Sequence, residues 1–405
     1  MSDRTRTERW WTCTPRDFTG GESFFSRDTG LLCLGFRQLG MDSKAVLLGG
    51  PREDDKPWVV RATIQQLRSA RWWASQKIEG VVLYAWARPE YTPVAEAIRE
   101  AGVRLILSQD SGGLVSPVCG VPEWIQDRWR WASRSGLWGP LVFILQIVRG
   151  LTWGLATQDL RRLDHLSVAD RVAAVSPVAL ARYQRFFRWF GREDLVGRWG
   201  WLPHAVSSGG RCRQGVPRKK KIILSVGRWE DEAQKQPDLL VEVIEKVLES
   251  DEDARFIIFG RPTSTMIRWS DALDAQMRDR VEFRGAVDHQ SIVAAMEEAK
   301  ILLVPSSCES FHIAAGEALC CGMSVVAARS PSLPSFSWFV SDGDGTLAPK
   351  LCGRALAGAL RAEIAAWEED AREPDAIALR WGQRLHESSV AARVVAGFGN
   401  DPPSA

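Results

Sequence analysis

Short apolar runs alternate with longer amphipathic segments along the whole chain of 405 residues. The runs have the length and β-branched content of buried strands, and the segments between them repeat apolar residues at helical spacing. Strands that alternate with helices in this way are typical of parallel sheets. In the first half we predict strands at 10–14, 45–48, 80–84, 103–108 and 171–175, and helices at 29–39, 58–75 and 94–101. In the second half we predict strands at 222–226, 255–259, 281–284, 301–304 and 324–327, and helices at 238–248, 269–278, 290–298 and 313–319.

A polar, basic and glycine-rich run at 206–221 separates these two sets of strands. Such a run is typical of a connection between domains. The fold class that follows is α/β, with two Rossmann-like domains built on parallel sheets. We expect a first domain at 1–205, a second at 206–375, and a C-terminal helix with a tail at 376–405, because apolar residues recur through 377–394.

The segment from Val304 to Gly322 carries the strongest functional signal. It joins the end of an apolar strand to a helix through a loop that holds Glu309, and Glu317 follows eight residues later inside the helix. Backbone N–H groups at the start of the helix, near His312, suit a phosphate or pyrophosphate. Gly322 supplies the left-handed residue that ends the helix. Two carboxylates beside an anion-binding helix end could hold a sugar nucleotide, with the acids on its hydroxyls and the amides on its phosphates.

A second landmark lies upstream, where the strand at 222–226 ends in a glycine turn. Arg228 follows that turn, and Lys235 comes shortly before the helix at 238–248. Open α/β sheets bind ligands at the carboxyl ends of their strands, so both cations are placed to meet an anionic ligand. The alternative is that the two side chains pair with the acidic residues at 230–232 on the surface.

The strand, loop, helix and glycine around Glu309 and Glu317 resemble the Glu-x7-Glu motif of the retaining, nucleotide-sugar-dependent glycosyltransferases. This family, glycosyl transferases group 1, has the GT-B fold, in which two Rossmann-like lobes face a central cleft. The resemblance covers residues 170–350 well and the first lobe only by its layout. It also implies that the C-terminal helix crosses back onto the first lobe.

The resemblance implies roles for residues of the second lobe. Arg228 and Lys235 would be catalytic by neutralising the departing diphosphate, and Glu309 would be catalytic by holding hydroxyls of the sugar. Glu317 would bind the ribose. The remaining donor-binding residues would lie around the helix start and near the base, namely Ser310, Phe311, His312, Ile313, Arg261 and Val287. The chain departs from the family at Ser310 and His312, which stand where the family has glycines.

Three residues of the first lobe are candidates for contacts with the donor phosphate or the acceptor. Gly21 belongs to a glycine pair after the first strand, where the family has a loop that lets the backbone approach these groups. Asp110 ends another strand and could accept a proton from the acceptor hydroxyl. Trp86 also follows a strand and could stack on an acceptor sugar. The alternatives are that Asp110 caps the turn at 111–113 and that Trp86 only packs.

Composition narrows the class of protein without naming a ligand. A net charge of +2 and a hydrophobic content of 45% give no indication of a nucleic-acid partner. Eight cysteines lack Cys-x2-Cys spacing and the N-terminal segment is polar, so we expect a cytoplasmic protein with free thiols. The five histidines are dispersed, and Asp342 and Asp344 lie in a glycine turn. We therefore predict no metal and no cofactor beyond the donor.

One region, 124–153, is rich in tryptophan and arginine and contains the apolar run 141–145. Such a segment suits a helix that lies in a membrane interface, which would give a peripheral contact at the inner face of the membrane. The run is shorter than the ~20 apolar residues that a spanning helix needs. The alternative, which we expect, is ordinary burial against the first sheet.

These patterns and the resemblance together predict a cytoplasmic, retaining glycosyltransferase of the hexosyltransferase type. It would move a sugar from a nucleoside diphosphate sugar to a hydroxyl of a glycan or lipid-linked acceptor, in glycan or polysaccharide biosynthesis. Two alternatives stay open. One is a catalytically silent partner protein that binds nucleotide sugars, which His312 favours, and the other is a two-lobed sugar-nucleotide isomerase.

Overall fold

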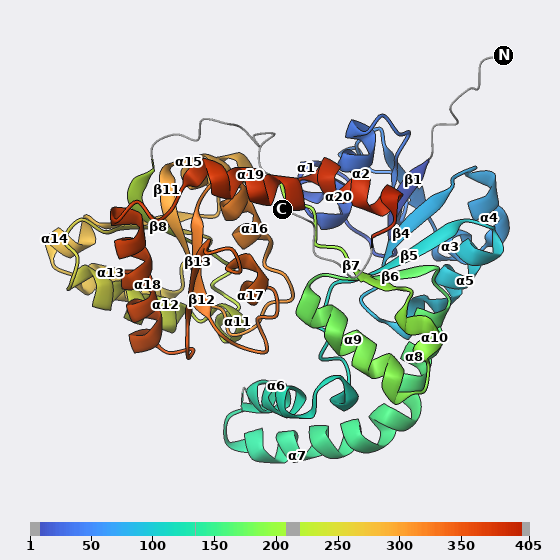
Figure 1. Cartoon of the computed structure of the whole chain (residues 1–405), viewed down its shortest axis with the longest axis horizontal. Helices are drawn as coiled ribbons and strands as arrows, with labels where there is room; N and C mark the ends of the chain where they lie inside the picture. The colour runs from blue at the N-terminus through green and yellow to red at the C-terminus, as the bar shows by residue number, and fades with distance from the viewer. Residues whose placement is uncertain (1–8, 134, 208–218, 399–405) are drawn as a thin grey trace. The chain divides into compact units, whose positions relative to one another are not determined.

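The computed structural model describes residues 9–133, 135–207 and 219–398. These residues form two compact units, each built around one parallel sheet (Figure 1). The first unit contains the described residues up to Ala205 and those from Glu387 onward. The second unit contains the described residues from Val206 to His386.

The first unit has a seven-stranded sheet in the order β3-β2-β1-β4-β5-β6-β7, and every neighbouring pair is parallel. Its strands are β1 (Trp10–Thr14), β2 (Ala45–Leu48), β3 (Val59–Ala62), β4 (Gly80–Tyr84), β5 (Arg104–Gln109), β6 (Arg171–Ala174) and β7 (Trp199–Trp201). The chain moves outward from β1 to β3 and then returns to the other side of β1 with β4. Open α/β sheets bind ligands at the carboxyl ends of the strands beside such a reversal.

Helices cover this sheet and close its core. They are α1 (Glu22–Phe25), α2 (Asp28–Gln38), α3 (Ile64–Leu67), α4 (Ala70–Ser75), α5 (Thr92–Glu100), α6 (Val121–Ser133), α7 (Gly139–Arg149), α8 (Asp159–Ser167), α9 (Pro177–Trp189), α10 (Glu193–Val196) and α20 (Glu387–Ala396). Three short 3-10 turns, η1 (Pro89–Tyr91), η2 (Pro117–Cys119) and η3 (Gly136–Trp138), and a π-helical segment, η4 (Gly150–Gln158), complete the unit.

The C-terminal helix α20 supplies part of the core of the first unit. Leu31 and Phe36 of α2 are buried together with Val390 of α20 in one apolar cluster. The two helices approach so closely that a Cβ at Gly35 would lie 2.1 Å from the carbonyl oxygen of Glu387. Glycine at position 35 is therefore required for α20 to pack on α2.

The second unit has a six-stranded parallel sheet in the order β10-β9-β8-β11-β12-β13. Its strands are β8 (Lys220–Val226), β9 (Arg255–Phe259), β10 (Val281–Gly285), β11 (Ala299–Val304), β12 (Ser324–Ala328) and β13 (Gly345–Ala348). Its helices are α11 (Glu232–Lys235), α12 (Pro237–Leu248), α13 (Ser264–Ala272), α14 (Ala275–Arg278), α15 (His289–Glu298), α16 (Ile313–Cys320), α17 (Phe336–Phe339), α18 (Gly353–Glu368) and α19 (Pro374–Leu385). The reversal of strand order falls here between β8 and β11.

The expected α/β class with two parallel sheets is confirmed, but several elements differ from the prediction. The helix expected at 58–75 is wrong, because 59–62 forms the edge strand β3 beside β2. A capping box between Thr63 and Gln66 then starts the short helix α3. The helix expected at 269–278 is divided, because the Asp274 side chain caps a new helix, α14. Strands β7 and β13 were not predicted.

The single helix expected within 376–405 is also wrong. The structure has α19 and α20, which are separated at His386, a residue with extended backbone angles of φ −57° and ψ 141°. Helix α19 packs on α16 and belongs to the second unit, whereas α20 belongs to the first. The chain therefore changes units after His386 rather than near residue 375.

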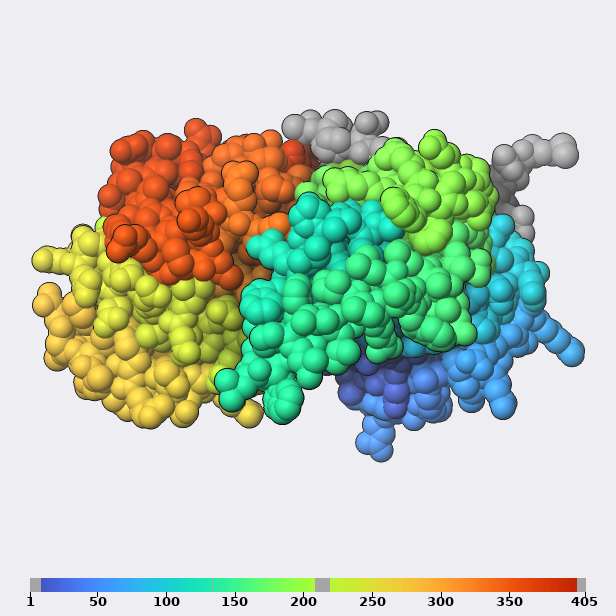
Figure 2. Space-filling view, turned by 90° about the horizontal axis from the view of Figure 1, so that it is seen from below, coloured from blue at the N-terminus to red at the C-terminus, as the bar shows by residue number. Residues whose placement is uncertain are grey.

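The 124–153 region is not buried against the first sheet, so that expectation is wrong. Helix α7, segment η4 and helix α8 form one continuous helix, Gly136–Ser167, and α6 packs along its α7 part (Figures 1 and 2, teal to green). In the part of the chain that the structure describes, this is the one helix whose length and composition would allow it to cross a membrane. Only 6% of its most apolar stretch is buried.

Candidate functional site

The loops after β8 and β9 meet at the carboxyl edge of the second sheet through glycine. Gly260 has φ +105°, and a Cβ there would lie 1.8 Å from the carbonyl oxygen of Gly227. Only glycine allows the two loops to approach this closely. Arg228 and Arg261 follow these glycines directly, and Val287 follows β10, their neighbour in the sheet. All three candidate residues therefore lie at the edge where ligands of α/β sheets bind.

Lys235 and Glu309 form a nearly buried ion pair at this edge. Lys235 ends α11, Glu309 lies in the loop after β11, and the distance from Nζ to Oε1 is 2.5 Å, with each side chain 11% exposed. Ser307 fastens that loop to α11, because its N–H donates to the carbonyl oxygen of Gln234 at 2.8 Å. Lys235 thus pairs across the strand reversal with Glu309, and the alternative that it pairs with the acidic residues at 230–232 is wrong.

The Glu309 carboxyl is held in its ionised form. Burial alone would raise its pKa, but the neighbouring His312 and Lys235, together with hydrogen bonds from Lys235 and Ser306, outweigh burial and lower it. Arg228 differs from Lys235, because its side chain is exposed and forms no ion pair with any residue in the described ranges. The site thus offers one accessible cation and one that is already paired.

His312 occupies a backbone conformation that favours glycine. Its angles are φ +73° and ψ +81°, and its Nδ1 accepts a hydrogen bond from the Ala315 N–H at 3.0 Å, so it caps α16. Glycine, which the family has at this position, adopts such a left-handed backbone without strain, whereas His312 adopts it with strain. Burial lowers the pKa of His312 to about 4, so its ring is neutral near pH 7. The N–H groups of Ile313 and Ala314 precede the capped one in the first turn of α16.

Ser310 and Phe311 anchor the loop that leads into α16. The carbonyl oxygen of Ser310 accepts a hydrogen bond from Ser335 Oγ at 2.8 Å. The ring of Phe311 is buried and packs edge-on against Phe339, with 5.2 Å between ring centroids. Phe311 is therefore a core residue by its side chain, and it can meet a ligand only through its backbone.

Glu317 is buried inside α16 and pairs with a histidine that the sequence did not single out. His289 Nε2 lies 2.7 Å from Glu317 Oε1. This hydrogen bond is the largest influence on His289 and raises its pKa, although burial opposes the shift. His289 opens α15 directly after the capping residue Asp288. In the sequence, the only indication that His289 belongs to the site was its position at the start of a predicted helix that follows a strand.

A pocket of about 150 Å³ lies at the strand reversal of the first unit and brings two of the three first-lobe candidates together. It is lined by Thr14, Phe18, Thr19, Ser23, Phe24, Arg27, Asp28, Thr29, Trp86 and Asp110. Trp86 has φ +49°, a left-handed conformation that is rare for a large side chain. Gly21 does not line the pocket but caps α1 within the same loop, between lining residues Thr19 and Ser23.

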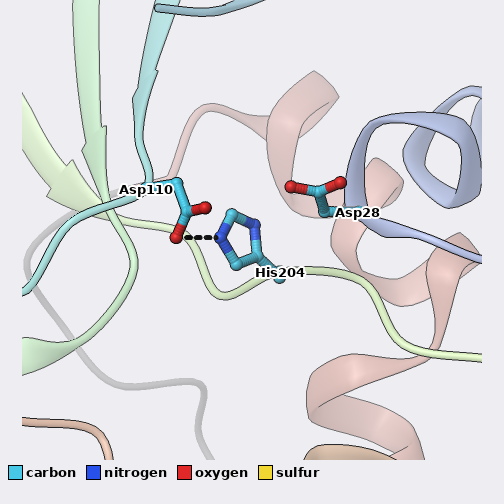
Figure 3. A group of neighbouring side chains, drawn as sticks. All are labelled: Asp28, Asp110 and His204. Atoms are coloured by element: carbon cyan, nitrogen blue, oxygen red, sulfur yellow. Dashed lines mark ion pairs between the residues drawn. The ribbon is translucent and has the colours of Figure 1, made fainter. Parts of the chain in front are cut away.

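Asp110 belongs to a group of three titratable side chains at this pocket (Figure 3). His204 Nε2 lies 3.0 Å from Asp110 Oδ1, and Asp28 faces the imidazole from α2. Burial alone would lower the pKa of His204, but the charge and hydrogen bond of Asp110 and the charge of Asp28 raise it above its usual value. His204 was missed as a site residue, although it stands where the family's Ile-Pro-Asn-Gly-Val element has its asparagine.

The same three side chains form the one cluster of metal-ligand types that the described residues contain, with ligand atoms within 4.8 Å of one another. A metal would need an unprotonated imidazole nitrogen. Because Asp28 and Asp110 raise the pKa of His204, a metal at this cluster would have to displace a proton that the imidazole binds more readily than usual.

Asp342 and Asp344 are both engaged by arginines of α19. Arg384 Nη1 lies 2.5 Å from Asp342 Oδ2, and Arg380 Nη1 lies 2.5 Å from Asp344 Oδ1. Trp381 Nε1 also donates to Asp344 at 2.7 Å. The two aspartates therefore hold α19 against the turn before β13.

A second hollow, in the second unit, lies at the opposite end of its sheet. It has a volume of about 710 Å³ and includes the first residues of β8 and β9. Its charged side chains pair with one another, as in Lys220 with Glu298 and Arg284 with Glu282. Parallel sheets bind ligands at the other edge, so this hollow does not mark the functional site.

Solved structures match the chain over nearly its whole length. The alpha,alpha-trehalose 6-phosphate synthase of Burkholderia multivorans matches with a TM-score of 0.60 and 11% identity, over 96% of both chains. HepE of Anabaena, solved in complex with UDP, matches with a TM-score of 0.59 and 13% identity, over 96% of this chain and 98% of that one. At such identities the likeness shows the fold alone, which is the two-lobed GT-B fold.

The sequence of the second unit matches a family model. Residues 220–364 match the family model described as "Glycosyl transferases group 1", which confirms the resemblance drawn from Glu309 and Glu317. D-Inositol 3-phosphate glycosyltransferases of Xylanimonas cellulosilytica and Mycolicibacterium smegmatis are each 34% identical to the chain, over 149 and 127 residues. These alignments cover 34% and 30% of this chain and 34% and 27% of the relatives, so they span about a third of the relatives' length.

Proposed function

We propose that this protein is a retaining glycosyltransferase that moves a sugar from a nucleoside diphosphate sugar to an acceptor hydroxyl. The observation that carries the proposal is the Lys235–Glu309 pair beside the start of α16. It lies at the strand reversal of a unit that matches glycosyl transferases group 1. A cation, a carboxylate and helix amides meet there, and these are the groups that a sugar diphosphate requires.

The diphosphate would be bound by cations and amides. Arg228 is accessible, and Lys235 would exchange Glu309 for a phosphate oxygen. The N–H groups of Ile313 and Ala314 and the dipole of α16 would add to the same field. Because negative charge grows on the diphosphate as its bond to the sugar breaks, these groups stabilise the transition state more than the ground state. We propose that no metal and no further cofactor take part, since Arg228, Lys235 and the amides of α16 already face the diphosphate.

The carboxylates would hold the sugar and the nucleoside. Glu309, released by Lys235, would accept hydrogen bonds from sugar hydroxyls. Glu317 would accept hydrogen bonds from the ribose. His289 would keep the Glu317 carboxylate oriented before the nucleotide binds. Arg261 and Val287 follow the neighbouring strands and would border the base.

The first unit would bind the acceptor, which we take to be a glycan or a lipid-linked hydroxyl. The pocket offers the rings of Phe18 and Trp86 to a sugar face and the Asp110–His204 pair to a hydroxyl. That pair could receive the hydroxyl proton as the new bond forms. Gly21 would support this loop.

We place the reaction in the cytoplasm. The seven cysteines in the described ranges form no disulfide, and burial raises the pKa of the Cys33 and Cys119 thiols to about 12. Buried thiols that form no disulfide are typical of proteins in a reducing compartment.

The test combines binding and turnover. Thermal shift against a panel of nucleoside diphosphates and their sugars should show stabilisation by one nucleotide family, since a ligand of the folded state raises its stability. Release of nucleoside diphosphate should then require an acceptor and persist in excess chelator, and the anomeric configuration of the product should match that of the donor. Lys235→Met should lose turnover, whereas Lys220→Met, which breaks the exposed pair with Glu298 at the far end of the sheet, should not.

A catalytically silent nucleotide-binding protein is the second candidate. Glu317 is already satisfied by His289, and His312 fills the position where the family has glycine. This candidate predicts thermal stabilisation by the nucleotide with no release of nucleoside diphosphate under any acceptor. A sugar-nucleotide isomerase would instead change the donor sugar without an acceptor.

A further inference from the structure

We propose that the exposed face of the α6–α7–η4 hairpin docks on the surface of an anionic lipid bilayer. The hairpin comprises residues 121–133 and 136–158, and the inference does not depend on whether the protein transfers sugars. Figure 2 shows this part of the first unit, in teal and green, on the open surface.

The face that α7 turns outward is apolar. Leu141, Ile144, Leu145 and Val148 have exposed fractions of 49%, 57%, 59% and 54%. Their spacing of three and four residues places them on one side of the helix. A surface helix of a globular protein presents polar residues on this side, so the face is built to meet a partner that is itself apolar.

The opposite face of α7 and η4 is already packed on α6. The rings of Trp129 and Phe143 meet edge to face, with 5.2 Å between their centroids. A Cβ at Gly150 would lie 2.5 Å from the Trp124 ring, so glycine lets η4 approach α6 closely. The helix formed by α7 and η4 therefore packs on α6, and the exposed apolar face of α7 does not pack on the sheet of its own unit.

Four tryptophans of the hairpin are exposed. Trp129, Trp131, Trp138 and Trp153 have exposed fractions of 48%, 42%, 69% and 54%. Indole rings carry an apolar body and an N–H donor, and they concentrate where hydrocarbon meets headgroups. A bilayer surface provides this environment for all four side chains at once.

The charge of the hairpin selects anionic lipid. Across residues 121–158 the sequence has four arginines and two acidic residues, Glu123 and Asp127, so its net charge is +2. Asp127 pairs with Arg128 and Arg130, and the side chain of Arg149 is exposed. The remaining positive charge attracts anionic headgroups. A second copy of the chain docked through the same face would instead oppose arginine to arginine.

The hairpin would lie on the bilayer rather than cross it. α6 starts from η2, which packs on α9, and α8 packs on α5 before the chain enters β6. Both ends therefore return to the same unit. Arg149 also divides the apolar stretch, and α8 adds Asp159, Arg161 and Arg162. Burial of one face satisfies the apolar residues and leaves these charges in the headgroup layer.

The test is flotation of the purified full-length protein with lipid vesicles. Wild type should float with vesicles that contain phosphatidylglycerol, bind pure phosphatidylcholine vesicles at least about tenfold more weakly, and be released by high salt. Leu141→Gln combined with Leu145→Gln should lower binding about tenfold or more, because two apolar side chains no longer enter the bilayer. The matched control is Leu379→Gln, whose leucine is 50% exposed on α19 of the second unit and should leave binding unchanged.

Four results would overturn the proposal. They are no flotation of wild type, equal binding to both kinds of vesicle, equal binding by the double variant, and a requirement for detergent to detach the protein, which would indicate a spanning segment. Sedimentation velocity without lipid tests the second-copy alternative: a wild-type dimer that the double variant dissociates would show that this face is a protein interface. Unchanged thermal unfolding of the double variant would confirm that the loss of binding is not a loss of fold.

Discussion

Replacing Lys235 by methionine would leave the Glu309 carboxylate buried without its cation. In the native protein the two side chains are each 11% exposed and their charged atoms are 2.5 Å apart. Removing one member of a buried ion pair costs about 3–5 kcal/mol, because the other charge stays desolvated. We expect the free energy of unfolding to fall by about 3 kcal/mol, the lower end of this range. The reason is that His312 also faces Glu309 and can take up a proton, which would replace part of the lost positive charge.

The loss should depend on pH in a defined direction. In the native protein the pKa of Glu309 lies below its usual 4.5, so its ionised form stabilises the fold above that value and the gain is lost as pH falls through the lowered pKa. Without Lys235 burial dominates, and the pKa should rise above the usual value. The loss in the free energy of unfolding of Lys235→Met therefore grows as pH rises through the new pKa of Glu309. It is smaller at a pH where Glu309 is protonated.

Urea unfolding of Lys235→Met and wild type at about pH 5 and about pH 8 measures this difference. The double variant Lys235→Met with Glu309→Gln should recover most of the loss at the higher pH, because no charge is left to bury. Lys220→Met, which breaks an exposed pair, should change stability by no more than about 0.5 kcal/mol. A loss of equal size at both pH values, together with additive effects in the double variant, would refute the reasoning.

Three further predictions concern stability. Gly322→Ala should destabilise the protein by about 1–2 kcal/mol or more, because φ is +77° and the new Cβ would lie 2.6 Å from a carbonyl oxygen of α19. Gly358→Ala, in open space on α18, should instead stabilise it by about 0.5–1 kcal/mol, and thermal unfolding of both variants checks this. Acidification from about pH 7 to about pH 5 should cost about 2 kcal/mol each at His165 and His312, whose pKa burial lowers to about 4. Their contribution is complete above the usual 6.5 and is lost as pH falls toward the folded value. Because the raised pKa of His204 and His289 acts in the opposite direction, calorimetry compares wild type with His165→Gln, and an equal pH dependence of the two proteins would contradict the prediction. Ending the chain before Glu387 should destabilise the first unit and leave the second folded, which limited proteolysis with mass spectrometry would reveal.

The strands could be predicted from the sequence because buried parallel strands are continuous apolar runs. The runs at 10–14, 45–48, 80–84 and 255–259 coincide with β1, β2, β4 and β9. The edge strand β3 was missed because Arg61 interrupts a short run. The partners of that arginine, Asp55, Asp17 and the carbonyl oxygen of Leu48, meet it only in the folded protein.

The pairs of the site could not be predicted, because they join residues that are distant in sequence. Lys235 meets Glu309 and His289 meets Glu317 only after the loops of different strands converge. The exposure of α7 could not be predicted either, because the sequence of an apolar helix face is the same whether that face packs on a sheet or is exposed.

The first unit is discontinuous in sequence, and this has a consequence for its synthesis on the ribosome. Its core includes Val390 and Val394 of α20, which are translated after the whole of the second unit. The nascent chain can complete the sheet of the second unit while the apolar side of α2, with Leu31 and Phe36, still lacks its cover. We therefore expect the first half of the chain to remain a client of chaperones until α20 has been translated, although domains usually fold in the order in which they emerge. A stop codon directly after His386 would leave every strand of both sheets encoded and yet release a protein whose first unit lacks part of its core.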